Sequence, residues 1–253
     1  MIPLVLVGSA GRMGRAIEQA LAGVDDLALK ARVERRDRWP AGASDWREDA
    51  EGVLAAGDVA VDFSGPEACA ALARLCAGRG AALVTGTTGL DAAGEEALRA
   101  AAAKVAVLRA ANFSLGLAAL RRALAAALAA LPEGWDVEIV ERHHRMKADS
   151  PSGTALALAA DAAARGGEVR CGRGRGRTGP RPPGEIGVHA IRGGTWVGDH
   201  TVLLAGDGEW LELRHVVQDR QAFAGAALAA ARFVARARPG LYTLEDVTGT
   251  SRP

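Results

Sequence analysis

The first half of the chain alternates between short apolar runs and longer segments of helical composition. Apolar runs of about 4 to 8 residues that end at turn residues are typical of strands buried on both faces of a sheet. When helices separate such strands, the sheet is expected to be parallel and doubly wound. The expected strands cover residues 2–7, 27–33, 58–63, 81–85 and 105–110, and a polar linker covers 37–49.

The second half has a different pattern, in which apolar and polar residues alternate. A helix over 115–130 leads to a strand over 135–140 and a helix over 155–164. Three later segments alternate with period two and have glycine at their turns, which predicts a mixed or antiparallel sheet. These segments are 186–190, 196–204 and 209–216. An open sheet of this kind is a natural subunit interface.

A glycine-rich turn, GSAGRMG, joins the first strand to the first helix. Gly8 permits a tight turn, Gly11 lets backbone approach a pyrophosphate, and Gly14 lets the helix lie close to the strand. The free amides of the helix N-terminus can then bind phosphate. The pattern predicts a dinucleotide site, although a structural turn without a ligand has the same glycines.

An acid at the end of the second strand strengthens this interpretation. Glu34 lies twenty residues beyond Gly14, where a carboxylate accepts hydrogen bonds from the adenosine ribose. Arg35 and Arg36 follow it, and a guanidinium there suits the 2′-phosphate of NADP. Solvated charges on an exposed loop are the alternative for both arginines. NADH and NADPH are therefore both candidate cofactors.

Two small-residue segments, GTTG at 86–89 and AANFS at 110–114, follow the fourth and fifth strands. Ligands of parallel sheets bind outside the carboxyl ends of strands, so Thr87 and Thr88 are candidates to contact a nicotinamide carboxamide. A plain tight turn explains GTTG equally well.

The last helix, over 220–237, and the segment 241–247 have the composition to pack back on the first domain. The predicted fold is an α/β, Rossmann-type nucleotide domain with an inserted α+β domain. Its expected parts are a dinucleotide-binding domain of residues 1–114 with 220–253 and a substrate-binding and oligomerisation domain of residues 115–219.

Composition excludes several classes of protein. The chain has 253 residues, is 49% hydrophobic and has a formal net charge of +1, which argues against a nucleic-acid partner. Three cysteines without metal-ligand spacing argue against disulfides and zinc, and we expect no metal. No apolar stretch suits a membrane, so a cytoplasmic protein is expected. The segment 170–183 is rich in arginine and glycine, and we expect an irregular loop whose arginines lie over a cleft for an anionic substrate.

Side chains that can act in catalysis are most concentrated between Glu138 and Thr154. His143, His144 and Lys147 fall within five residues, on a predicted connection between a strand and a helix. Imidazole and ammonium groups are proton donors, and the helix start at Ser152-Gly153-Thr154 suits a carboxylate. A basic surface run and a histidine metal site are the alternatives, and adjacent histidines have poor geometry for a metal.

Four segments of the sequence carry a resemblance to a known family: GSAGRMGR, GTTG, AANFS and above all ERHHRMKADSPSGTA. Together with GDHT at 198–201 and RQAFA at 220–224, they resemble the dihydrodipicolinate reductases, now called 4-hydroxy-tetrahydrodipicolinate reductases. The resemblance implies an NADH- or NADPH-dependent enzyme of the diaminopimelate route to lysine that acts on a cyclic dicarboxylate, with loss of water. It also implies a homotetramer.

The resemblance also implies roles for individual residues. His143 is then the proton donor or acceptor, Lys147 is a proton donor, and His144, Gly153 and Thr154 bind substrate. The residues that would hold the nucleotide are Gly8, Ser9, Ala10, Gly11, Arg12, Met13, Glu34, Arg35, Gly86, Thr87, Thr88, Ala110, Ala111, Asn112 and Phe113.

Two other functions stay open. A reductase or dehydrogenase acting on a semialdehyde or a sugar would explain the nucleotide signals but not HHRMK with SGT. A redox sensor that binds the dinucleotide and controls a partner would need no proton donor, and the chain lacks a basic DNA-reading helix.

Overall fold

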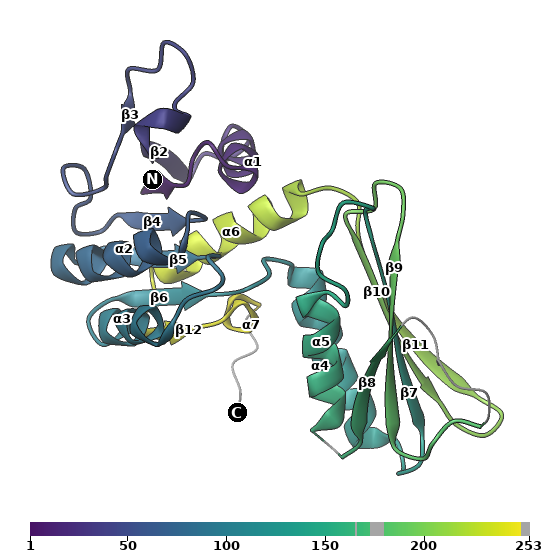
Figure 1. Ribbon diagram of the computed structural model, residues 1–253. Coiled ribbons are helices and arrows are strands. Elements are labelled where there is room, and N and C mark those ends of the chain that lie inside the picture. The colour runs from purple at the N-terminus through teal and green to yellow at the C-terminus, as the bar shows by residue number, and fades with distance from the viewer. Residues whose placement is uncertain (165, 173–179, 249–253) are drawn as a thin grey trace. The chain divides into compact units, whose positions relative to one another are not determined.

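The computed structural model describes residues 1–164, 166–172 and 180–248, which form two compact units. The first unit comprises Met1–Leu115 and the chain from Arg220 onward, and the second comprises Gly116–Asp219. The elements of both units are labelled in Figure 1.

Within the described residues, seven strands of the first unit form one sheet in which every neighbouring pair is parallel. Their order is β12-β6-β5-β4-β1-β2-β3, which contains the Rossmann order 3-2-1-4-5-6 and has its switch point between β1 and β4. The strands are β1 (Ile2–Val7), β2 (Leu27–Val33), β3 (Trp46–Arg47), β4 (Val59–Asp62), β5 (Ala82–Thr85), β6 (Ala106–Arg109) and β12 (Gly240–Tyr242).

Helices cover both faces of this sheet (Figure 1). Leu4 and Leu6 of β1 pack with helices α1 (Arg12–Leu21) and α6 (Gln221–Val234). Val5 and Val7 pack with α2 (Pro66–Arg79) and α3 (Ala92–Ala102). Alternate residues of β1 therefore pack into two hydrophobic cores, one on each face of the sheet. This explains why the sequence of β1 is continuously apolar. The short helices η1 (Arg36–Arg38) and α7 (Leu244–Val247) complete the unit.

The second unit contains a mixed sheet, with the order β11-β10-β7-β9-β8 in the described residues. The β11/β10 and β10/β7 pairs are antiparallel, whereas β7/β9 and β9/β8 are parallel. Helices α4 (Leu115–Ala130) and α5 (Gly153–Ala163) pack on one face (Figure 1). The strands are β7 (Asp136–His143), β8 (Glu168–Gly172), β9 (Glu185–Arg192), β10 (Gly198–Ala205) and β11 (Trp210–Val217).

The expected α/β fold, with a parallel nucleotide-type sheet and a second mixed sheet, is confirmed. Three local expectations were wrong. The linker over 37–49 contains the two-residue strand β3. Strand β7 continues to His143, because Arg142 and His143 still pair with Asp199 of β10 and Arg192 of β9, so His143 lies on a strand. Strand β8 occupies the start of the segment expected to be irregular, and residues 173–179 of that segment lie outside the described residues.

No helix within the described ranges is both long enough and apolar enough to span a membrane.

Candidate active site

The glycine-rich turn after β1 is close-packed against its neighbours. Gly8 has φ +81°, and a Cβ there would lie 2.6 Å from the carbonyl oxygen of Phe63. A Cβ on Gly14 would lie 2.5 Å from the carbonyl oxygen of Gly8, so the first turn of α1 sits directly on the loop. Gly11 is the N-cap of α1, whose N-terminal amides suit an anion. These features fit the pyrophosphate of a dinucleotide.

Glu34, just beyond β2, is buried against this turn. Its carboxylate accepts hydrogen bonds from the amides of Ala10 at 3.2 Å and Arg35 at 3.1 Å. Glu34 therefore binds the glycine turn at the edge of the sheet where β1 and β2 end. An acid that binds the adenosine ribose lies at this place in Rossmann-type domains. The Arg35 side chain is 74% exposed and pairs with Asp37 at 3.1 Å.

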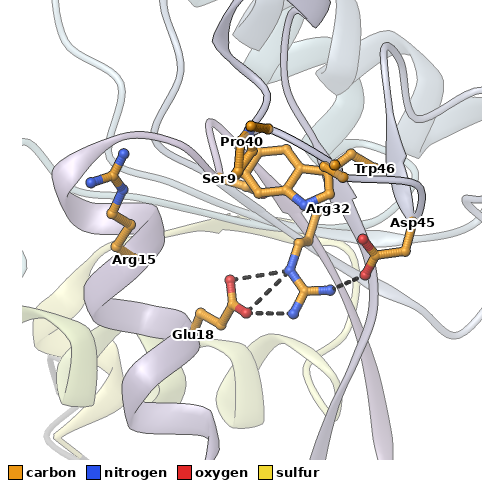
Figure 2. Close-up of a pocket in the computed structure, with 10 residues that line it drawn as sticks. Ser9, Arg15, Glu18, Arg32, Pro40, Asp45 and Trp46 are labelled. Carbon is orange, nitrogen blue, oxygen red and sulfur yellow. Dashed lines mark hydrogen bonds and ion pairs between the residues drawn. The ribbon is translucent and has the colours of Figure 1, made fainter.

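Beside the turn lies an open hollow of about 570 Å³, lined by Ser9, Arg15 and Arg32 among others. Figure 2 shows Arg32 between Glu18 and Asp45, with its Nε 3.1 Å from Glu18 and its Nη1 2.6 Å from Asp45. Arg15 lies apart from these carboxylates (Figure 2). Arg15 and Arg32, which the sequence analysis did not select, line the hollow, and Arg35 is not among its lining residues.

Segments GTTG and AANFS leave the carboxyl ends of β5 and β6, as expected. The hydroxyl of Thr87 is 2.8 Å from the buried carboxylate of Asp62 and donates to it, so this hydroxyl braces the turn. Phe113 is 3% exposed and lies edge-on to Phe63, so its side chain belongs to the core and only its backbone is free for a ligand. The Phe63 ring fills the space beside Gly86, where a Cβ would lie 2.2 Å from it.

In the second unit, the fully buried carboxylate of Glu141 is the centre of the histidine cluster. Its Oε2 accepts from Nδ1 of His143 at 2.6 Å and from Nη1 of Arg192 at 2.7 Å. Its Oε1 accepts from Nη2 of Arg192 at 2.7 Å and from the amide of Ser152 at 2.9 Å. Glu141 thus joins the end of β7, the end of β9 and the start of α5.

Burial acts to raise the pKa of Glu141, but the hydrogen bonds from His143, Arg192 and the Ser152 amide outweigh it and lower that pKa to about 2. The opposite happens at His200, which lies edge-on to His143 with ring centroids 5.0 Å apart. Burial first, and the neighbouring His143 second, lower the pKa of His200 to about 4. Glu141 is therefore an anion and His200 a neutral base near pH 7.

The start of α5 is capped by a serine that also contacts His200. Ser152 is its N-cap, and the Ser152 hydroxyl accepts from the amide of Ala155 at 3.2 Å and lies 3.2 Å from Nε2 of His200. Gly153 and Thr154 are the first helical residues, where backbone amides point out of the helix. These are two of the positions selected from the sequence for substrate.

Lys147 and His144 lie on the connection between β7 and α5. Lys147 Nζ is 2.8 Å from the carboxylate of Asp149, whose pKa is lowered first by that hydrogen bond. The Asp149 carbonyl accepts from Nη2 of Arg192 at 2.5 Å, so a continuous path of contacts links Lys147 to Glu141. The amide of His144 donates to the carbonyl of Trp196 at 2.8 Å.

The structure brings His143, Lys147 and the N-cap Ser152 into one network. It does so through three residues that were not candidates from the sequence, which are Glu141, Arg192 and His200. Glu141 has a sequence signal, because two residues separated by one position on a strand lie on the same face. Arg192 is 51 positions away from Glu141 and has no local signal.

Two arginines of the arginine- and glycine-rich segment, Arg170 and Arg181, lie within the described residues, and both form ion pairs. Arg181 binds Asp136 at 2.7 Å and Glu138 at 3.0 Å, and Arg170 binds Glu168 at 2.8 Å. These carboxylates neutralise them, and Asp136 marks the end of β7 opposite to His143. The expectation that arginines of this segment lie over a cleft for an anionic substrate stays a prediction, because Arg173, Arg175 and Arg177 lie outside the described residues.

A Rossmann-type sheet has a glycine-rich turn and an acid at the end of β2, and the second unit carries a buried cluster of glutamate, histidine and arginine. This combination is typical of nucleotide-dependent oxidoreductases. Comparison with known proteins specifies it further. Residues 2–113 match the family model "Dihydrodipicolinate reductase, N-terminus", and residues 116–248 match "Dihydrodipicolinate reductase, C-terminus".

Similar proteins carry the same description along their whole length. The 4-hydroxy-tetrahydrodipicolinate reductase of Caulobacter vibrioides is 44% identical, over 98% of this chain and 97% of its own. That of Nitrosomonas europaea is 42% identical, over 98% of this chain and 99% of its own. A dipicolinate-bound dihydrodipicolinate reductase from Paenisporosarcina sp. TG-14 has the same fold, with a TM-score of 0.82 at 24% identity over 97% of this chain and 99% of that one. The chain belongs to the dihydrodipicolinate reductase family.

Proposed function

We propose that this protein reduces 4-hydroxy-tetrahydrodipicolinate to tetrahydrodipicolinate in the diaminopimelate route of lysine biosynthesis. The substrate, NADH or NADPH, and one proton give tetrahydrodipicolinate, the oxidised nucleotide and water. The observation that carries the proposal is the Glu141 carboxylate, which joins the His143 ring to the helix start at Ser152 within a chain of this family.

The first unit is proposed to bind the nucleotide, which supplies the hydride when bound. Gly8–Met13 would hold its pyrophosphate on the α1 amides, and Glu34 its ribose. Gly86–Thr88 and Ala110–Phe113 would contribute backbone groups at the carboxyl ends of β5 and β6. For the 2′-phosphate of NADPH, Arg35 is the sequence candidate, and Arg15 is a second cation because it lines the hollow beside the turn.

The second unit is proposed to bind the substrate and move protons. The amides at Gly153 and Thr154 suit one carboxylate of a cyclic dicarboxylate, and His144 would contact the same molecule. The structural relative from Paenisporosarcina sp. TG-14 is described as dipicolinate-bound, and dipicolinate is a dicarboxylate of this kind. Hydride addition to a ring with an imine places negative charge on nitrogen, so Lys147 or His143 would donate a proton there.

We also propose a cytoplasmic homotetramer assembled through the mixed sheet. The helices α4 and α5 pack on one face of this sheet. On the other face, Val216 of β11 is 48% exposed, Ile191 of β9 is 40% exposed, and Trp210 of β11 is 71% exposed. Exposed apolar side chains on the sheet face opposite to the helices suit contact with a second copy.

The test is a coupled assay. The protein is added to the freshly formed condensation product of pyruvate and aspartate semialdehyde with NADH, and then with NADPH, while absorbance is followed. Oxidation that requires the condensation product supports the proposal. Binding of both nucleotides without any oxidation would contradict it and favour the sensor interpretation.

A further inference from the structure

Strand β7 carries two clusters of the same composition, each with a glutamate, a histidine and an arginine. In the first, Glu141 binds Nδ1 of His143 at 2.6 Å and Arg192 at 2.7 Å. In the second, Glu138 binds Nε2 of His189 at 2.6 Å and Arg181 at 3.0 Å. The two clusters differ in two ways. Glu141 is fully buried whereas the side chain of Glu138 is 23% exposed, and Glu141 also accepts a hydrogen bond from the amide of Ser152.

Resting on the proposed function, we propose that Glu141 is a positioning residue for the reaction: it fixes the His143 ring with Nε2 available to substrate and fixes the substrate-binding start of α5. No substrate contact is assigned to Glu141 itself. Its effect is transmitted through His143 and through the amide of Ser152.

The proton positions follow from the chemistry of the groups. An ionised carboxylate accepts hydrogen bonds and donates none, and Glu141 is ionised because its pKa is about 2. The ring nitrogen that faces it, Nδ1 of His143, must therefore carry a hydrogen. In the neutral ring, Nε2 is then the acceptor, and in the charged ring Nε2 donates a proton.

Gly198 of β10 leaves Nε2 uncovered. A Cβ at this position would lie 3.3 Å from Nε2 of His143, so glycine provides the space beside the reactive nitrogen. Among the described residues, Nε2 has no hydrogen-bond partner, whereas Nδ1 is held by Glu141. The ring is thus anchored on one side and free on the other.

Four donors converge on Glu141: Nδ1 of His143, two nitrogens of Arg192 and the amide of Ser152. A neutral amide at the same position has one oxygen to accept with and one nitrogen that must donate. In Glu141→Gln, one orientation of that nitrogen leaves the amide of Ser152 without its acceptor. In the other orientation, Nδ1 of His143 must either lose its partner or accept from the glutamine, which moves the ring hydrogen to Nε2.

Glu138→Gln is the matched control. Glu138 lies three positions earlier on the same strand, so it points to the opposite face of the sheet. Its side chain is 23% exposed, and its carboxylate contacts neither His143 nor the start of α5. The two variants make the same chemical change on the same strand.

The first experiment compares kcat, KM and nucleotide affinity for the wild type and both variants. For Glu141→Gln we expect kcat to fall on the order of 100-fold, the size of a lost proton-transfer group, while the Kd for NADH changes less than about twofold. For Glu138→Gln we expect a change below about threefold. Size-exclusion chromatography checks that the three proteins share one oligomeric state.

Retention of wild-type kcat by Glu141→Gln, or an equal loss in Glu138→Gln, would overturn the inference. A wild type without activity would instead contradict the proposed function. The two failures are therefore distinguishable.

A second measurement needs no Glu141 variant and remains decisive if Glu141→Gln does not fold. Nitrogen-15 NMR of the wild type reports which imidazole nitrogen carries hydrogen, and single His→Gln variants assign the signals. We expect neutral His143 to carry hydrogen on Nδ1. Hydrogen on Nε2 instead would overturn the inference.

Discussion

The two units of the chain differ in the kind of group that each presents. All five histidines, His143, His144, His189, His200 and His215, lie in the second unit. In the first unit, the turns at strand ends are built from glycines, backbone amides and carboxylates such as Glu34 and Asp62. We propose a division of labour, in which the first unit provides fixed backbone for binding the nucleotide and the second provides groups that gain and lose protons.

The largest expected effect is in the second unit. His143→Ala and Lys147→Ala should each lower kcat by about 10²- to 10⁴-fold, because each removes a proposed proton-transfer group. The Kd for NADH, measured by fluorescence titration, should stay within about twofold of wild type because neither side chain belongs to the nucleotide unit. If NADH affinity fell as much as kcat, the proposed separation of nucleotide binding and proton transfer between the two units would be contradicted.

The second effect concerns pH and also belongs to the second unit. The pKa of His200 is lowered to about 4 in the folded protein, whereas the unfolded value is about 6.5. As pH falls below about 6.5, His200 becomes protonated in the unfolded chain but stays neutral in the folded protein. Stability is therefore lost between about pH 6.5 and pH 4.

The free energy of unfolding should therefore decrease by roughly 2 to 3 kcal/mol from pH 7 to pH 4.5 through His200 alone. Urea unfolding of wild type and His200→Gln at both pH values measures this contribution. The variant should show a smaller decrease by that amount. Equal decreases in the two proteins would mean that His200 is not a buried neutral base.

A third effect should be confined to the first unit. Glu34→Gln removes the charged acceptor proposed for the ribose and weakens the contact with the Ala10 amide, so the Kd for NADH should rise about 10- to 100-fold. At saturating NADH, kcat should recover to within about twofold of wild type. Glu96→Gln, an exposed change on α3 where Glu96 pairs with Arg99, is the control and should alter neither quantity.

The smallest effect tests the backbone turn. In Gly14→Ala, the new Cβ would lie 2.5 Å from the Gly8 carbonyl oxygen, and such overpacking costs about 1 to 3 kcal/mol. Gly78, also within a helix, has no atom within 4 Å of a Cβ. Gly78→Ala should therefore stabilise the protein by about 0.5 to 1 kcal/mol. Thermal unfolding that ranks Gly14→Ala as the more stable variant would contradict the close packing of the turn.

Much of the fold is predictable because local signals determine it. A continuous apolar run that ends at glycine predicts β1 with its observed bounds. The run of leucine, alanine and valine before Glu34, which includes Lys30 and Arg32, predicts β2, and alanine and leucine predict α4. Strand β3 could not be predicted, because a strand of two residues is too short to show an alternation of apolar and polar positions. The end of β7 escapes it because Arg142 and His143 are polar and are held in the ladder by partners on other strands.

The candidate site is predictable in part, for the same reason. Glycines and catalytic residue types cluster in sequence, so Gly8 and His143 are selected without a structure. Arg192 and His200 are contributed to the network by β9 and β10, and only the sheet register brings them to Glu141 and Ser152. The roles of the selected site residues stay predictions until the variants are measured.

Hydride transfer from NADH to the substrate can be followed with an isotope label. NADH deuterated at both C4 positions is supplied with the fresh condensation product of pyruvate and aspartate semialdehyde, and the product is analysed by mass spectrometry. We expect tetrahydrodipicolinate that carries deuterium, in an amount equal to the NADH oxidised. NADH oxidation that yields unlabelled product, or no oxidation at all, would contradict it.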